Sequence, residues 1–309
     1  MARSDRPSVA VLMATYNGEK YVAQQVQSLA AQSFDNLHLY VRDDGSTDRT
    51  VSIVLETLNR GGRRLPLELE EGEHVGVPHA FFHLLLHAPS SHDYYAFADQ
   101  DDIWFPTKVQ HALETLRPLE DGLPLLYFCR QRYVTEDLTP AGYSPLVKNP
   151  GLANALVQNP AKGCTQVFNR AAFELVRENL PSSVPWHDWW VYLTVAAMGK
   201  VVFDPRIEID YRLHKKSTIG EVMNPLAKTL KRLARLLLYG NLQARFQAEV
   251  FLKTHAGKLP MQAERMIRRF VEGQRHFKDR FRYAFSMDVC RLDPWENVAL
   301  RFLILMNRS

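Results

Sequence analysis

Two groups of acidic side chains follow two strand-like apolar segments of this chain. Asp43 and Asp44 end one segment, and Asp99, Asp101 and Asp102 end the other. Clustered carboxylates repel one another, which is costly unless a cation or hydrogen-bond donors compensate. An Asp-x-Asp arrangement at a strand end can hold a hard divalent cation and leave positions for the oxygens of a diphosphate.

Turns and helix caps are the alternative explanation for both groups. The segment Asp43-Asp44-Gly45-Ser46 is rich in residues that turns and helix N-caps prefer, so it fits a turn as well as it fits a ligand site. Residues 99–102 are four polar residues enclosed by apolar ones on both sides, and for them a metal site is the favoured hypothesis.

Alternating strands and helices must position these acidic groups. Short β-branched runs alternate with segments whose apolar residues recur at helical spacing. The expected strands are 9–14, 37–41, 65–69 and 94–98, and the expected helices are 21–31, 51–58 and 78–87. This alternation predicts an α/β fold with a mainly parallel sheet and helices on both faces. Ligands of such sheets bind at the carboxyl ends of the strands, where both acidic groups lie.

The chain divides into an α/β part, residues 1–220, and a helical part, residues 221–309. Within the first part, residues 8–120 are the regular nucleotide-binding half. Residues 121–220 are less regular, with expected strands at 125–128, 165–168 and 200–203. The helical part has 17 basic and 8 acidic residues, although the net charge of the whole chain is only +4. Its expected helices are 226–238, 242–253, 261–285 and 296–306.

Composition indicates an ordinary soluble globular protein. The chain has 309 residues, of which 46% are hydrophobic and 23% charged, which excludes a disordered or fibrous chain. Its three cysteines are widely spaced, which argues against a disulfide scaffold and favours a reducing compartment. No apolar stretch is long enough to cross a bilayer, and MARSDRPS leads directly into a strand. A cytoplasmic location is therefore expected.

Three segments together resemble the family-2 inverting glycosyltransferases of GT-A fold. They read VAVLMATYNGEKYVAQQVQSLAAQSF, LYVRDDGSTDRT and YYAFADQDDIWFPTKV, in the order and spacing usual for that family. Later segments resemble the bacterial rhamnosyltransferase branch: KGCTQVFNR, HDWWVYLTVAAMGKVVFD and YRLHKKSTIG. The resemblance covers residues 8–220 and implies a mixed, mainly parallel sheet flanked by helices, followed by the helical region.

This resemblance implies a binding site for a nucleotide-sugar donor. Asp44 matches the aspartate that accepts a hydrogen bond from the pyrimidine N3–H, a contact that suits an ionised carboxylate. The other residues expected at the donor are Thr15, Tyr16, Asn17, Glu19, Gly76, His79, Asp99 and Arg212. His79 stands where the branch usually has asparagine, which leaves the donor preference open.

The resemblance also implies a divalent cation, Mg²⁺ or Mn²⁺. Asp99 and Asp101 match the family's metal-binding pair, with Asp101 as the direct ligand and Asp102 in support. His214 matches a histidine that reaches the metal or the diphosphate, although a lone histidine is as often structural. Arg212 could neutralise leaving phosphate, since a guanidinium binds phosphate in a bidentate manner. A surface charge in a loop is the alternative for Arg212.

Asp188 matches the catalytic base of the family. Such a base deprotonates the acceptor hydroxyl as that hydroxyl attacks the anomeric carbon. A helix N-cap is the structural alternative, since HDWWVYLTVAAM begins an expected helix, and both roles are compatible. The nearby tryptophans would desolvate the carboxylate and could stack on a sugar ring. The residues expected at the acceptor are Trp186, His187, Trp189, Trp190, Gly163, Cys164 and Thr165.

The first expectation for the donor is dTDP-L-rhamnose, with UDP-hexoses next, and the acceptor is a glycan or a lipid-linked glycan. Two other functions compete. A nucleotidyltransferase or an NAD-dependent oxidoreductase also uses an α/β sheet, but GxGxxG after the first strand and GxxxxGK[ST] are both missing. A sugar-nucleotide-binding protein without activity is the other alternative, and the intact set Asp44, Asp99, Asp101 and Asp188 argues against it.

The basic helical region offers a surface for an anionic membrane. Lys228, Lys231, Arg232 and Arg235 face away from leucines on one expected helix, and a second basic run spans 265–282. A solvated helix face or a dimer interface is the alternative. A peripheral position on the inner face of the plasma membrane follows from the membrane hypothesis. Nucleic-acid binding is not expected, because aromatic residues for stacking are not interleaved with the charges.

Overall fold

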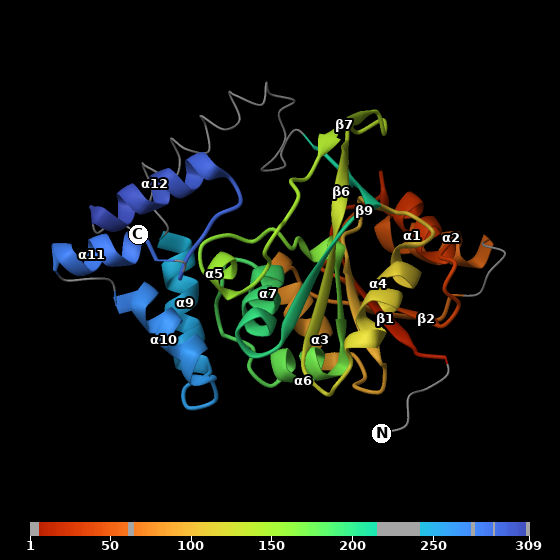
Figure 1. Ribbon diagram of the computed structural model, residues 1–309. Helices are drawn as coiled ribbons and strands as arrows, with labels where there is room; N and C mark the ends of the chain where they lie inside the picture. Colours follow the sequence, from red (N-terminus) through yellow and green to blue (C-terminus); the bar gives the residue numbers. More distant parts are fainter. Residues whose placement is uncertain (1–5, 61–64, 215–241, 273–275, 287, 307–309) are drawn as a thin grey trace.

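A computed structural model describes residues 6–60, 65–214, 242–272, 276–286 and 288–306. Its centre is one mixed sheet in the order β3-β2-β1-β4-β8-β6-β9-β5, with β7 paired to β6 (Figure 1). The strands are β1 Val9–Thr15, β2 Leu37–Asp43, β3 Leu67–Glu71, β4 Tyr94–Ala98, β5 Ile103–Trp104, β6 Leu125–Val134, β7 Pro140–Tyr143, β8 Gln166–Asn169 and β9 Lys200–Arg212.

The two halves of the sheet differ in strand direction. The pairs β1–β2, β2–β3 and β1–β4 are all parallel. Beyond β4 the pairs are antiparallel except for β6–β9. The expected mixed sheet is therefore confirmed, with its parallel pairs gathered mainly in the first half. β6 and β9 are also much longer than the expected strands 125–128 and 200–203, because each continues past the core toward the ligand edge.

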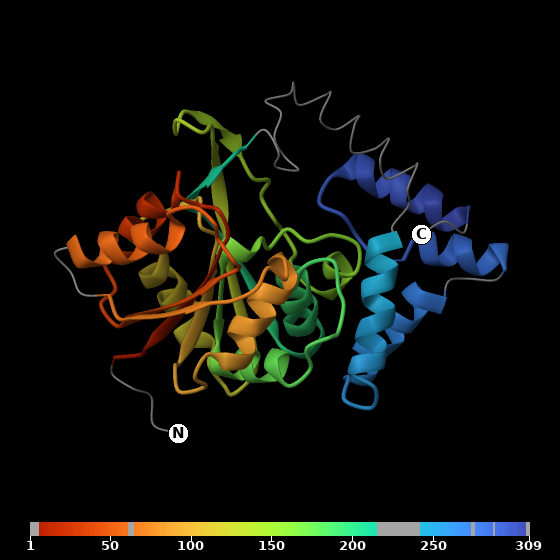
Figure 2. The same cartoon turned by 180° about the vertical axis from the view of Figure 1, so that it is seen from behind.

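Helices cover both faces of the sheet, as the alternation of its side chains requires. Val9, Val11 and Met13 of β1 face one hydrophobic core, and Ala10 and Leu12 face another. The first core is covered by α1 Val22–Ala30, α2 Thr50–Arg60 and α4 Lys108–Leu116. The second core is covered by α3 Val77–His87, α6 Arg170–Arg177 and α7 His187–Met198, which Figure 2 shows from behind.

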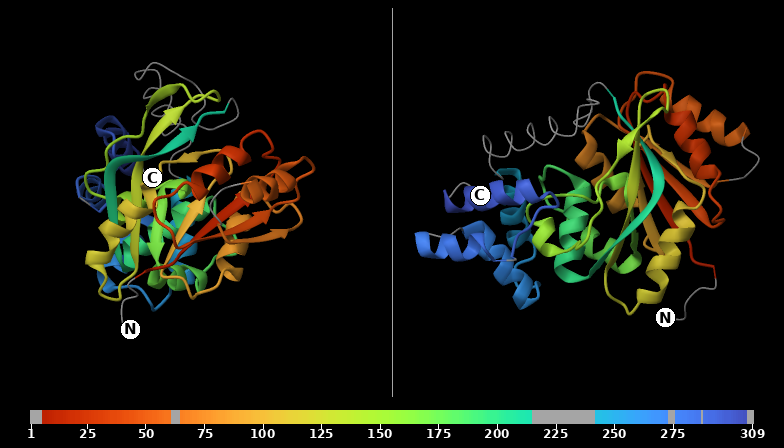
Figure 3. Two further views of the ribbon diagram at one scale, coloured as in Figure 1. Left: turned by 90° about the vertical axis from the view of Figure 1, so that its right-hand side faces the viewer. Right: turned by 45° about the horizontal axis from the view of Figure 1, so that its top comes forward.

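The helical region packs against the second core through α7. It consists of α9 Leu242–Thr254, α10 Met261–Glu272, α11 Phe277–Ala284 and α12 Pro294–Leu305. Trp190 of α7 lies edge-on to Phe251 of α9, with ring centroids 5.3 Å apart. Asp293 caps α12, since its carboxylate accepts hydrogen bonds from the N–H groups of Trp295 and Glu296. Figure 3 shows these helices at the end of the molecule away from β1–β3.

The expected helix 261–285 is two helices in the structure, α10 and α11. The expected helix 226–238, with Lys228, Lys231, Arg232 and Arg235, lies outside the described residues. Within the described ranges, the helices are too short or too polar to cross a bilayer. Short elements complete the fold: α5 Leu152–Ala155, η1 Arg117–Leu119 and η2 Gly163–Thr165.

Candidate active site

The loops after β1 and β2 are bound to each other by the residues expected at the donor. The Asn17 N–H donates to Ser46 Oγ at 2.9 Å, and the Thr47 N–H donates to Asn17 Oδ1 at 2.9 Å. Asn17 has a positive φ of 46°, which asparagine tolerates better than most residues. Glu19 Oε2 accepts from the Arg49 N–H at 3.2 Å. Asn17 and Glu19 therefore hold the loop after β1 against the loop after β2 by hydrogen bonds.

Asp43 and Thr15 form the base of this paired loop. Both are almost fully buried, and Thr15 Oγ1 donates to Asp43 Oδ1 at 2.7 Å. The second oxygen of Asp43 accepts from the Ser46 N–H at 2.7 Å. Asp43 thus has the turn-forming role that was one of the two alternatives for this segment.

Tyr16 lies at the junction between the two acidic loops. Its backbone N–H and C=O form a reciprocal pair of 2.9 Å hydrogen bonds with the side-chain amide of Gln100. Its ring is exposed and stacks on His74, with centroids 4.1 Å apart. A Cβ on Gly18 would meet the end of the Gln100 side chain, which would have to move away from Tyr16. Gln100 was not predicted as a site residue, and its hydrogen bonds to the Tyr16 backbone show that it joins the two loops.

Asp44 is the most fully bonded carboxylate of the first acidic loop. It accepts from Arg42, from the N–H groups of Val75 and Gly76, and it lies 2.8 Å from His74 Nδ1. Burial would raise the pKa of Asp44, but the two backbone N–H donors and Arg42 outweigh it and lower that pKa. Gly76, with φ of 83°, therefore reaches Asp44 through its backbone.

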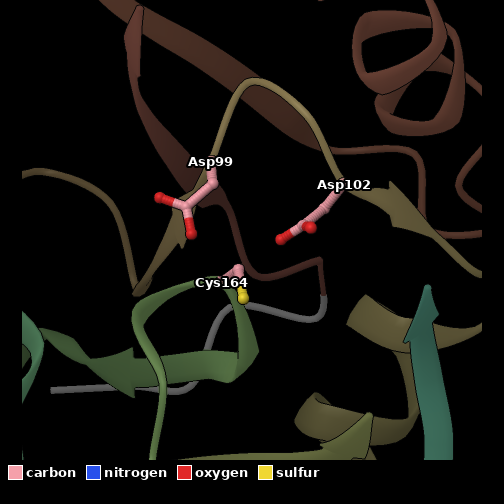
Figure 4. Close-up of side chains that lie close together, drawn as sticks. All are labelled: Asp99, Asp102 and Cys164. Atoms are coloured by element: carbon pink, nitrogen blue, oxygen red, sulfur yellow. The ribbon is translucent and has the colours of Figure 1, made fainter. Parts of the chain in front are cut away.

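The second acidic loop joins β4 to β5 and brings Asp99 and Asp102 to Cys164 of η2 (Figure 4). One ligand atom from each of these three residues lies within 4.8 Å of the other two. Asp102 is 1% exposed, its Oδ1 accepts from the Arg212 N–H at 3.1 Å, and its Oδ2 has no hydrogen-bond partner. A buried carboxylate oxygen without a partner is costly, which is typical of a site that waits for a ligand.

Electrostatics distinguish this second loop from the first. Burial, together with the charges of Asp101 and Asp188, raises the pKa of Asp99 to about 7. Burial and the charges of Asp101 and Asp99 raise the pKa of Asp102 well above its usual value. The two carboxylates are oxygen ligands of the kind that Mg²⁺ or Mn²⁺ prefers, and the unpartnered oxygen of Asp102 fits that use. Burial raises the pKa of the Cys164 thiol well above its usual value, so this neutral thiol is not a ligand for such a cation.

Lys108 is a buried cation beneath these carboxylates that the sequence reading missed. It is fully buried, donates to the Cys164 carbonyl, and its Nζ lies 3.1 Å from the centroid of the Trp104 ring. Burial lowers the pKa of Lys108 to about 8, although the nearby acids oppose that shift. The signal was present in the sequence, because Lys108 is one turn before Ala112 on the apolar stripe of α4.

Asp101 points to the end of β9 rather than into the cluster of Asp99, Asp102 and Cys164. Its Oδ2 lies 2.6 Å from His214 Nε2. Arg212 is 2% exposed, and its guanidinium donates to the Asp101 carbonyl, to Glu136 O and to Gln24 Oε1. The structure therefore corrects the expectation that Arg212 neutralises donor phosphate: this side chain braces the acidic loop from inside.

Asp188 lies beside the second acidic loop, near enough for its charge to raise the pKa of Asp99. Its Oδ2 accepts from the Gly163 N–H at 3.0 Å, and its Oδ1 accepts from the Trp189 N–H at 2.7 Å. It stands in the first turn of α7, whose N-cap is Trp186, so the alternative that Asp188 is the helix N-cap is wrong. Two backbone donors hold the carboxylate in a fixed orientation.

Of the three tryptophans around Asp188, only Trp186 is exposed. Trp189 is 8% exposed, and its Nε1 donates to Ala155 O at 2.7 Å. Trp190 is fully buried against Phe251 and His255. The expectation that Trp189 and Trp190 stack on the acceptor is therefore wrong, because both belong to the core that joins α7 to its neighbours.

The other residues expected at the acceptor are also buried. Cys164 belongs to the carboxylate cluster, and Thr165 Oγ1 donates to the Lys162 carbonyl at 2.6 Å. His187 stacks on Phe81 at 3.9 Å, and burial lowers its pKa to about 4. A Cβ on Gly163 would lie 2.9 Å from His187 Nε2, so glycine lets η2 approach α7. These residues support Asp188 from behind, which corrects their assignment to the acceptor.

His79 lies on the exposed side of α3, away from the carboxylate cluster. It lines an open groove of about 590 Å³ together with Arg42, Val75, Phe82 and Arg177. Arg42 and Val75 also contact Asp44, so this groove adjoins the first acidic loop. The position of His79 is therefore compatible with a role at the donor end but does not place it at the metal.

Residues 10–137 match the family described as Glycosyl transferase family 2. The match covers less than half of the chain and includes both acidic loops, so this part of the chain is similar to family-2 glycosyltransferases. An uncharacterized glycosyltransferase of Rickettsia typhi is 26% identical over 239 residues, which are 71% of this chain and 68% of that protein. The dTDP-rhamnosyl transferase RfbG of Shigella flexneri is 25% identical over 229 residues, 70% of this chain and 76% of RfbG.

Solved structures of glycosyltransferases share the GT-A fold of this chain. S. aureus TarS 1–349, in complex with UDP-GlcNAc, has a TM-score of 0.57 at 16% identity, over 96% of this chain and 81% of TarS. The mannosyltransferase PcManGT of Pyrobaculum calidifontis, in complex with GDP-Man and Mn²⁺, has a TM-score of 0.57 at 20% identity, over 98% of this chain and 75% of PcManGT. At these identities the likeness shows the fold alone.

Proposed function

We propose that this chain is a family-2 glycosyltransferase, a metal-dependent, inverting enzyme that transfers L-rhamnose from dTDP-L-rhamnose to a glycan or lipid-linked acceptor of a cell-surface polysaccharide. The observation that carries the proposal is the position of Asp188, an oriented carboxylate beside the cluster of Asp99 and Asp102. The sugar is supported by RfbG, a relative named as a dTDP-rhamnosyl transferase. A UDP-hexose donor is the alternative within the same chemistry.

In this proposal the chain's own residues orient the donor and move one proton. The loops of Tyr16 and Asp44 hold the nucleotide, and Asp99 with Asp101 or Asp102 holds Mg²⁺ or Mn²⁺. When bound, the cation stabilises the negative charge that develops on the departing nucleotide diphosphate. The acceptor oxygen bonds to the anomeric carbon while the bond from that carbon to the diphosphate oxygen breaks. Asp188 takes the acceptor proton, and the exposed ring of Trp186 offers a stacking surface for a sugar.

A donor screen followed by one substitution tests this function. The purified chain is assayed for nucleotide release and for donor binding with dTDP-L-rhamnose, UDP-sugars and GDP-sugars, with Mg²⁺ or Mn²⁺. We expect Asp188→Asn to lower kcat by about 10²- to 10⁴-fold, the usual contribution of a general base, while donor binding is retained. Asp121→Asn is the matched control, because Asp121 is exposed at the opposite edge of the sheet.

Each outcome separates the candidate functions. Binding without turnover in the wild type, unchanged in Asp188→Asn, would favour a non-catalytic sugar-nucleotide-binding protein. Turnover with UDP-hexoses alone would replace the rhamnosyl assignment and keep the mechanism. Equal turnover of Asp188→Asn and wild type would overturn the role of Asp188.

The proposed contact with an anionic membrane gains little from the part of the basic run 265–282 that lies on α10. Within its described part, Arg268 pairs with Glu264 and Glu272, and Arg269 pairs with Asp288. Exposed pairs of this kind neutralise charge that would otherwise attract anionic lipid. A cytoplasmic enzyme acting at the membrane therefore needs a different docking surface, or else this region forms a dimer interface.

A further inference from the structure

Helices α11 and α12 present an apolar surface to solvent, although each also has a buried side. On α11 the exposed residues recur every four positions, at Phe277, Phe281 and, just past its end, Phe285. On α12 and just after it the exposed residues are Trp295, Val298, Phe302 and Met306, with Trp295 68% exposed. We call these seven residues the aromatic face. Singly exposed apolar residues are ordinary, whereas a contiguous patch of this kind indicates an interaction site.

The two rows of side chains form one surface. The rings of Phe281 and Phe285 lie 4.9 Å apart, and the Arg301 guanidinium of α12 lies 5.5 Å from the Phe285 ring of α11. Opposite sides of both helices are anchored in the core by Tyr283, Leu300 and Ile304. The aromatic face is therefore carried on packed helices, and Figures 1 and 3 show α11 and α12 side by side at one end of the molecule.

The charges around the aromatic face are mainly basic. The most exposed charged residues of α11 and α12 are Lys278, Arg282 and Arg301, and all three are basic, whereas the acids Asp279 of α11 and Asp293 at the start of α12 are half-buried. The acid Glu296 of α12 is buried and pairs with Arg291. Aromatic side chains with basic neighbours are the composition of helices that lie in the interface of an anionic bilayer.

We infer that the aromatic face docks the protein on an anionic lipid surface. Phe and Trp rings would enter the interfacial layer, and Lys278, Arg282 and Arg301 would reach the headgroup phosphates. A second copy of the chain is a poorer occupant, because a twofold contact through this face brings the same cations together. The inference deepens the proposed function, on which its biological purpose rests: it names the surface on which a lipid-linked acceptor would be met.

Vesicle binding by the full chain tests this inference without any glycosyl transfer. Sedimentation with vesicles of phosphatidylcholine is compared with sedimentation with vesicles that also contain phosphatidylglycerol. We expect binding to the anionic vesicles and a blue shift of tryptophan emission that Trp295→Phe removes. The combined variant Phe281→Ser, Phe285→Ser, Trp295→Ser should bind at least about tenfold less, since each ring contributes apolar burial. Lys278→Glu with Arg282→Glu should remove the preference for phosphatidylglycerol.

The control is Met261→Ser, which removes an exposed apolar side chain of α10 outside the aromatic face. Thermal unfolding verifies that the variants fold, as expected for exposed side chains. Unchanged vesicle binding by the triple variant, or a wild type that binds neither vesicle, would overturn the inference. A concentration-dependent dimer that the triple variant loses, without vesicle binding, would assign the face to a second copy. Failure of donor turnover with intact vesicle binding would instead reject only the proposed function.

Discussion

The two acidic loops at the ligand edge of the sheet contain the same residue type and have opposite electrostatics. In the loop after β2, Asp44 accepts from Arg42 and two backbone N–H groups, and its pKa is lowered. In the loop after β4, burial and like charges raise the pKa of Asp99 to about 7, and one oxygen of Asp102 has no partner. The carboxylate of Asp44 finds its hydrogen-bond donors within the protein, whereas the carboxylates of the second loop are arranged for a bound cation.

This difference separates Asp44, whose carboxylate is bonded within the fold, from Asp99 and Asp102, whose carboxylates are held together against their repulsion. Carboxylates whose native pKa is lowered contribute to stability, and carboxylates held together against their repulsion reduce it. Perturbed pKa values of the second kind concentrate at functional sites. Substitution in the first loop should therefore damage the fold, and substitution in the second should damage function while leaving the fold intact.

The largest expected effect is on transfer in Asp99→Asn. Removing one carboxylate of the cluster should lower kcat/KM by about 10³-fold, since a cation at such a site contributes several kcal/mol to the transition state. The free energy of unfolding of the metal-free variant should stay equal or rise, because a like-charge repulsion is removed. Urea unfolding and steady-state kinetics on the same preparation measure both. A marked loss of stability would contradict the distinction between the loops.

Asp44→Asn, in contrast to Asp99→Asn, is expected to lower the stability of the fold. The substitution leaves Arg42 buried beside a neutral amide, and we expect the free energy of unfolding to fall by about 2–4 kcal/mol. Asp121→Asn should change it by less than about 0.5 kcal/mol. Stability of Asp44→Asn within that small range of the wild type would show that the bonds of Asp44 are not structural.

The pH dependence of stability sharpens the assignment of Asp44. Because its folded pKa lies below the ordinary value of 3.8, Asp44 contributes stability that is complete above that pH. The contribution is lost as pH falls through the folded pKa. The wild type should therefore lose more stability below about pH 4 than Asp44→Asn does. The free energy of unfolding of both proteins is measured by urea titration between about pH 2 and about pH 5. Parallel dependence of that free energy on pH in the two proteins would reject this assignment.

The smallest expected effect is on the pH dependence of the free energy of unfolding, through His255. This buried histidine lies outside both acidic loops, so its contribution must be distinguished from theirs. Burial lowers the pKa of His255 from 6.5 to about 4, so the unfolded chain binds the proton first. This residue should cost the wild type about 1–3 kcal/mol as pH falls from 6.5 to 4. His255→Phe keeps the ring beside Trp190 and Phe251, and its unfolding free energy should fall less over that interval. An unchanged pH slope would show that His255 is not the group responsible.

Much of the first half of the molecule was predictable from sequence. Short continuous apolar strands and turn residues at their ends located β1, β2 and β4 and the two acidic loops. The second half was harder, since β6 and β9 continue as long strands beyond their apolar starts. Their pairing depends on contacts between residues far apart in the chain, which local periodicity does not reveal.

At the site, residue types predicted the chemistry but not which of several neighbouring residues has which role. Trp186, Trp189 and Trp190 are close in the sequence, yet only Trp186 is exposed, because it precedes α7 while Trp189 and Trp190 lie in the helix and enter the core. Arg212 looks like a phosphate ligand in sequence, but three internal acceptors engage it. Lys108 became a site residue, and Cys164 moved from the expected acceptor site to the carboxylate cluster, only when η2 and α4 met under the acidic loop.

Mn²⁺ binding is the measurement that tests the central claim most directly. The cation is titrated into wild type, Asp99→Asn and the control Asp121→Asn, with and without thymidine diphosphate, and free Mn²⁺ is followed by electron paramagnetic resonance. The account predicts one Mn²⁺ bound by wild type and by Asp121→Asn, and at least about tenfold weaker binding by Asp99→Asn, since a ligand carboxylate is lost. Equal binding by all three proteins, or none by the wild type, would contradict it.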